Sequence, residues 1–170
     1  MNKNLKMTAV LAVLVSLAFS ANTIWSFEKG HQPAEHHSAK SSVTADSALD
    51  KLMTANKNCV SGKLTTRDIA ARRGELVKGQ QPSAVVLSCS DSRVPPELIF
   101  DQGLGDIFVV RVAGNVADAI ALGSIEYAVE HLNVPLIIVM GHDKCGAVAA
   151  TVQGGKPEVN IQAIVEKISP

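Results

Sequence analysis

Residues 84–93, Ala-Val-Val-Leu-Ser-Cys-Ser-Asp-Ser-Arg, decide the fold of this chain. The run 84–88 is short, rich in valine and without polar alternation, which predicts a strand covered on both faces, as in a parallel sheet. Two runs of the same kind follow at 107–112 and 135–140. In open α/β sheets, ligands bind beyond the carboxyl ends of the strands. We therefore expect a site at Cys89 and at the residues after the third strand.

Helical patterns surround these strands. Ser47 is a suitable helix cap before apolar residues at helical spacing, and this first helix should end near Ser61 and Gly62. A second helix is expected over 66–78, ending at Gly79, a third over 147–152, and the start of another over 160–168. Between the second and third strands, 117–132 predicts a helix with four residues on its inner face: Ile120, Ile125, Ala128 and Val129.

The order of these elements predicts an α/β fold, with a mostly parallel β-sheet flanked by helices and an N-terminal helical arm. Residues 47–170 form this domain, after a polar linker over 21–46. The first 20 residues are typical of a cleaved signal peptide: Lys3 and Lys6 precede an apolar run that ends at small residues, with cleavage before Ala21. The mature protein is then expected to be periplasmic or secreted.

Three residues at the predicted carboxyl edge suit a metal. Cys89 follows the first strand, and His142 and Cys145 follow the third, within Gly-His-Asp-Lys-Cys-Gly-Ala-Val at 141–148. Two thiolates and one imidazole suit Zn²⁺, and three protein ligands leave the fourth position that a catalytic zinc needs. In a closed structural site, Asp91 would instead be the fourth ligand.

Asp91 and Arg93 lie beside the first ligand. The carboxylate can bind the metal or accept a hydrogen bond from a zinc-bound hydroxide, and Arg93 can hold it away from the metal by a bidentate pair. The other interpretation of the pair is a solvated salt bridge of little energetic value.

Together, Cys-Ser-Asp-Ser-Arg-Val at 89–94, Gly-Asp-Ile-Phe-Val-Val-Arg-Val-Ala-Gly-Asn at 105–115 and residues 141–148 resemble the β-class carbonic anhydrases. The resemblance covers about residues 47–170. It implies reversible hydration of carbon dioxide to bicarbonate and a proton by attack of a zinc-bound hydroxide. It also implies Cys89, His142 and Cys145 as zinc ligands, with Asp91 and Arg93 as the catalytic pair and Asp91 on zinc in a resting form.

The resemblance further implies a homodimer or a higher homo-oligomer. Where the family has Asn-x-Arg-Phe, this chain has Asn56-Lys57-Asn58-Cys59, which we expect to weaken packing of the first helix on a partner subunit. Family members continue beyond the equivalent of Pro170, so part of the C-terminal domain is expected to be missing.

The charge composition indicates which classes of partner are not expected. The formal net charge is zero, with 16 basic and 16 acidic residues, so neither nucleic acid nor, after signal cleavage, a membrane is expected as partner. Cys59 is expected to be a small buried hydrophobic residue. Two alternatives to carbon dioxide hydration are open: hydrolysis of carbon disulfide or carbonyl sulfide at the same site, and a non-catalytic zinc-binding domain.

Overall fold

The structure is a computed structural model that describes residues 43–170. The predicted signal peptide, residues 1–20, and the linker up to residue 42 lie outside the described residues. The predicted cap at Ser47 is wrong, because helix α1 (Ala45–Val60) begins two residues before it. The cap is Thr44, whose hydroxyl oxygen accepts a hydrogen bond from the Ser47 N–H at 3.2 Å.

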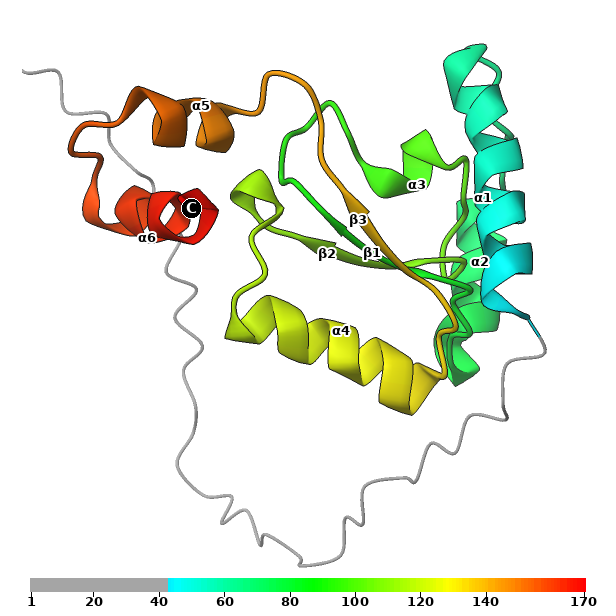
Figure 1. Ribbon diagram of the computed structural model, residues 1–170. Helices are drawn as coiled ribbons and strands as arrows, with labels where there is room; N and C mark the ends of the chain where they lie inside the picture. Colours follow the sequence, from blue (N-terminus) through cyan, green and yellow to red (C-terminus); the bar gives the residue numbers. More distant parts are fainter. Residues whose placement is uncertain (1–42) are drawn as a thin grey trace, which may run out of the picture. The chain divides into compact units, whose positions relative to one another are not determined.

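The sheet is parallel, as predicted. Its strands, in the part of the chain that the structure describes, are β1 (Val85–Ser88), β2 (Phe108–Arg111) and β3 (Ile137–Met140), in the order β2-β1-β3. Val85 lies opposite Phe108 on one side and Ile137 on the other, so the three strands are in register (Figure 1). All three therefore end at one edge, which places the residues after β1 and β3 side by side.

Helix α4 (Ala119–Leu132) covers one face of the sheet (Figure 1). Its inner stripe is Ala121, Ile125 and Ala128, three residues at a spacing of four and three that are at most 9% exposed. The predicted inner positions of Ile120 and Val129 are wrong: these side chains are 79% and 37% exposed. Each lies one residue from the stripe, and one residue is about 100° of rotation on a helix.

The opposite face of the sheet packs against α1 and the short helix α3 (Pro96–Ile99), which the sequence did not predict. Leu52 of α1 is fully buried there with Val86 of β1 and Phe100. The end of α1 is held by asparagines: Asn56 donates to the Ile99 carbonyl at 2.8 Å and Asn58 to Asp101 at 2.7 Å. The segment that departs from the family pattern thus fastens α1 within its own chain.

The remaining elements are shorter. The helix predicted over 66–78 is in fact α2 (Ile69–Glu75) followed by a 3₁₀ turn, η1 (Leu76–Lys78), because Asp68 caps it late by accepting from the Ala71 N–H. A 3₁₀ turn, η2 (Ala113–Asn115), follows β2, and α5 (Gly146–Gln153) and α6 (Val159–Ile168) end the chain. Within residues 43–170, no helix has the length and apolar character needed to cross a membrane.

Candidate metal centre

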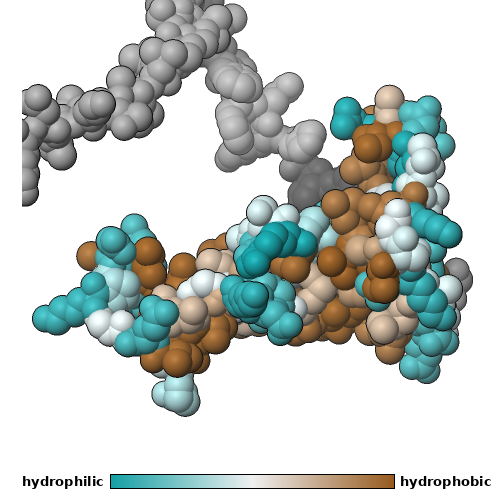
Figure 2. Space-filling view, turned by 90° about the horizontal axis from the view of Figure 1, so that it is seen from above, coloured by the Kyte–Doolittle hydropathy of each residue, from teal (hydrophilic) through white to brown (hydrophobic). Residues whose placement is uncertain are grey.

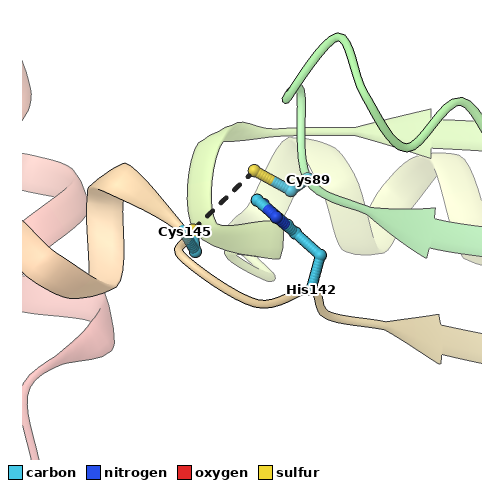
Figure 3. A group of neighbouring side chains, drawn as sticks. All are labelled: Cys89, His142 and Cys145. Atoms are coloured by element: carbon cyan, nitrogen blue, oxygen red, sulfur yellow. Dashed lines mark hydrogen bonds between the residues drawn. The ribbon is translucent and has the colours of Figure 1, made fainter.

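Three side chains predicted as metal ligands meet at the carboxyl edge of the sheet. Cys89 follows β1 directly, His142 lies two residues beyond β3, and Cys145 is the residue before the first turn of α5. Figure 3 shows the three side chains turned toward one another. Because β1 and β3 are neighbouring parallel strands, Cys89 and Cys145 come together although 56 residues separate them.

The spacing of the donor atoms fits a metal ion. One ligand atom from each of the three residues lies within 4.8 Å of the other two, and the two sulfur atoms are 3.9 Å apart. Two sulfurs bound tetrahedrally to one zinc at about 2.3 Å lie about 3.8 Å apart. Both cysteines are buried, with 5% and 8% of their surfaces exposed. The group can therefore hold a tetrahedral ion without rearrangement of the sulfurs.

The histidine offers the matching nitrogen. Nε2 of His142 is buried and makes no hydrogen bond, while Nδ1 lies 2.9 Å from the Asp143 carbonyl oxygen. Since a carbonyl only accepts, Nδ1 carries the proton and Nε2 presents a lone pair, as in metal-ligating histidines. The neighbouring Cys89 sulfur raises the pKa of His142 most, burial opposes this effect, and the Asp143 carbonyl and Asp91 add to it. This buried lone pair, within 4.8 Å of the two sulfurs, is suited to be the third ligand of a metal ion.

The surroundings of Cys89 favour its thiolate. Burial raises the pKa of this thiol, but the Asp91 backbone, the nearby His142 ring, the Gly114 backbone and Cys145 outweigh burial and lower it to about 7. The Gly114 N–H donates to the Cys89 sulfur at 3.3 Å. Metals bind cysteine as thiolate, so these donors support ligation.

Asp91 and Arg93 form a bidentate pair beside this group. Arg93 donates from Nε to one carboxylate oxygen at 2.8 Å and from Nη2 to the other at 2.7 Å, and its backbone N–H also donates, at 3.0 Å. These bonds hold the pKa of Asp91 well below its usual range, and the carboxylate in turn raises that of Arg93. One oxygen of Asp91 lies 3.9 Å from Nε2 of His142. The carboxylate thus faces the metal group while Arg93 holds both of its oxygens.

Two further residues that support the site were missed from the sequence. Arg111, the last residue of β2, donates to the Cys89 and Asp91 carbonyls, and Gly114 donates to the Cys89 sulfur. The sequence pattern that could have indicated Arg111 is a charged residue at the end of an apolar strand. Cys59, predicted to be buried, is only half-buried on α1 and lies outside the metal group.

The chain resembles known proteins over much of its length. The sequence model of the family described as carbonic anhydrase matches residues 84–170. A carbonic anhydrase of Mycolicibacterium smegmatis is 56% identical over 103 residues, which are 58% of this chain and 50% of that protein. Carbonic anhydrase 2 of Mycobacterium tuberculosis is 50% identical over 129 residues, 72% of this chain and 62% of that protein. The chain therefore spans between half and two thirds of the length of these relatives.

Solved structures agree on the fold. A tetrameric β-carbonic anhydrase of Sordaria macrospora is 29% identical, with a TM-score of 0.53 over 69% of this chain and 60% of that one. A Coccomyxa β-carbonic anhydrase, solved with acetazolamide, has the same identity and TM-score and is covered to 55%.

Proposed function

This chain belongs to the carbonic anhydrase family, and from that premise we propose that it catalyses the reversible hydration of carbon dioxide to bicarbonate and a proton. The observation that carries the proposal is the joint presence of a Cys₂His metal group and a bidentate Asp91–Arg93 pair beside it. A purely structural metal site does not need a carboxylate, such as that of Asp91, held beside the metal by an arginine.

Zn²⁺ is the ion that we propose for Cys89, His142 and Cys145, because two thiolates and one neutral imidazole suit it and the 3.9 Å sulfur separation matches its tetrahedron. When bound, Zn²⁺ supplies Lewis acidity that lowers the pKa of water toward about 7.

Asp91 would act on the attacking water. Its low pKa keeps the carboxylate ionised at neutral pH, so it can only accept a hydrogen bond, and accepting one from the water directs an oxygen lone pair toward carbon dioxide. Arg93 restrains both carboxylate oxygens, which keeps Asp91 as an orienting group and not a fourth ligand.

The test is stopped-flow carbon dioxide hydration on the purified full chain, with zinc measured on the same sample. We expect the unmutated chain to bind about one zinc and to hydrate carbon dioxide. The variant Cys89→Ser should lose both the zinc and the activity. Cys59→Ser is the matched control, because this cysteine lies outside the metal group and should retain both. Zinc without hydration would refute the proposal, and activity on carbon disulfide in that sample would identify the other substrate.

A homo-oligomer is part of this proposal. The Sordaria protein is described as tetrameric, and Figure 2 shows apolar surface exposed on the face it draws. Large exposed apolar side chains occur on α1, where Met53 is 53% exposed, on α4, where Ile120 is 79% exposed, and on β3, where Val139 is 63% exposed. Such surface is typical of subunit contacts. Light scattering coupled to size-exclusion chromatography should show a mass above 17.9 kDa, and a monomer at micromolar concentration would refute it.

Export is also proposed, on the basis of the apolar run that follows Lys3 and Lys6. Mass spectrometry of the mature protein from cell fractions should find an amino terminus at or near Ala21 in the periplasm or medium. An intact Met1 on the soluble protein would contradict this.

A further inference from the structure

We propose that Arg111 is a positioning residue of the site. Its guanidinium group holds the turn 89–91, so that the metal ligand Cys89 and the carboxylate of Asp91 keep a fixed distance and orientation. The inference rests on the proposed function, because it assigns Arg111 a part in that reaction. The guanidinium group of Arg111 binds backbone carbonyls, so Arg111 would act through the turn.

The contacts are specific to the arginine fork. Nε of Arg111 donates to the Cys89 carbonyl at 3.0 Å, and Nη2 donates to the Asp91 carbonyl at 2.6 Å. These are the carbonyls of two residues that both carry functional side chains. A guanidinium presents its N–H groups in one rigid plane, so binding two carbonyls fixes their separation and direction. A lysine ammonium has no such fixed pair.

The position of Arg111 in the sheet explains why it reaches this turn. Arg111 pairs with Ser88, the last residue of β1, and the ladder continues one step further. The Val112 N–H donates to the Ser88 carbonyl at 3.0 Å, and the Ser90 N–H donates back to the Val112 carbonyl at 3.3 Å. The side chain of Arg111 then binds two carbonyls of the turn that follows, those of Cys89 and Asp91.

A further backbone hydrogen bond connects this turn to Arg93. The Asp91 carbonyl also accepts from the Val94 N–H at 3.2 Å, which closes the turn that contains Arg93. The turn therefore sets the place of the thiolate and of the Asp91–Arg93 pair together. A shift of about 1 Å in such a group is enough to cost about 100-fold in rate.

Three variants of the full chain test the inference. Arg111→Gln removes the charge and the fork, Arg111→Lys keeps the charge and one donor, and Arg73→Gln is the control, because Arg73 is an exposed arginine on α2. The measurements are carbon dioxide hydration per bound zinc and amide hydrogen exchange. We expect kcat of Arg111→Gln to fall about 10- to 100-fold with little change in KM. Arg111→Lys should be intermediate and Arg73→Gln unchanged.

Hydrogen exchange separates positioning from a general loss of structure. Exchange should become faster at residues 90–93 in Arg111→Gln and stay unchanged at 85–88, where β1 keeps its ladder on both sides. A kcat per zinc within twofold of the unmutated protein, or unchanged exchange at 90–93, would overturn the inference. If Arg111→Gln does not fold, Arg111→Lys decides by the same two readouts. If the unmutated chain shows no hydration, the proposed function fails and the exchange pattern still tests the role of Arg111.

Discussion

Gly114 offers a sharp test of how the site is supported, through the change Gly114→Ala. Its φ of 66° lies in the left-handed region, where an L-residue costs about 1–2 kcal/mol. A Cβ atom built there would lie 3.0 Å from Cβ of Ala147 and 2.6 Å from Cδ1 of Ile168. Overpacking of this kind costs about 1–3 kcal/mol, and the end of Ile168 can move, which favours the lower part of that range. We expect a total loss of about 2–4 kcal/mol in the free energy of unfolding.

The assay is urea unfolding followed by far-UV circular dichroism, with two comparison variants. Gly123→Ala is the control, because Gly123 lies within α4 with no atom within 4 Å of an added Cβ. It should stabilise the protein by about 0.5–1 kcal/mol. Ile168→Val removes Cδ1, so in combination with Gly114→Ala the loss should be smaller than the sum of the single losses. Equal effects of the two alanines, or strict additivity with Ile168→Val, would show that neither the left-handed backbone nor the contact with Ile168 limits Gly114.

Three further predictions concern the site and the network that holds α1. Asp91→Asn should keep zinc but lose about 10- to 1,000-fold in turnover, because an amide also donates hydrogen bonds and orients the water less well; unchanged turnover would remove Asp91 from the mechanism. After chelation of the metal, the oxidant diamide should join Cys89 and Cys145 in a disulfide, because their sulfurs are 3.9 Å apart. Peptide mass mapping detects this disulfide, and free thiols at both Cys89 and Cys145 after treatment would contradict the prediction. Hydrogen bonds from Arg67, then from Asn58 and Thr65, hold the pKa of Asp101 below its usual range. Asp101 therefore stabilises the fold above its unfolded pKa of about 3.9, and this contribution is lost as pH falls below that value. The stability gap between the unmutated protein and Asp101→Asn, measured by urea unfolding, should be widest near neutral pH and shrink below about pH 4; a gap independent of pH would contradict this account.

The network around Asp101 shows how the tertiary structure adds to a local pattern. Asp101 is 3% exposed, and its side chain accepts from Asn58, Thr65 and Arg67. These donors lie between 34 and 43 residues away in the chain. The sequence pattern predicted the end of α1 near Ser61 but placed its cap at Ser47, three residues after the observed cap Thr44. Nothing in the sequence of α1 predicts the acceptor at its end.

Local patterns in the sequence alone determined the parallel strands and the edge at which the ligands lie. Apolar runs without alternation indicate buried strands, and the residue types Cys89, His142 and Cys145 at their ends indicate a metal. Both inferences need only neighbouring residues and the rule that parallel strands end at a common edge. This is why the architecture and the metal group could be predicted together.

Packing in three dimensions determines which side chains face the core and which ones support the site. Ile120 has the apolarity of a core residue but is exposed, because α4 is turned so that Ala121 and Ile125 meet the sheet. Arg111 resembles any charged residue at a strand end until β2 is placed beside β1, where its fork meets the carbonyls of the Cys89 turn. The physical reason is that helix rotation and contacts between distant segments depend on packing across the whole sheet. A local sequence pattern predicts whether a segment is a helix or a strand, but not the rotation of the helix or its contacts with distant segments.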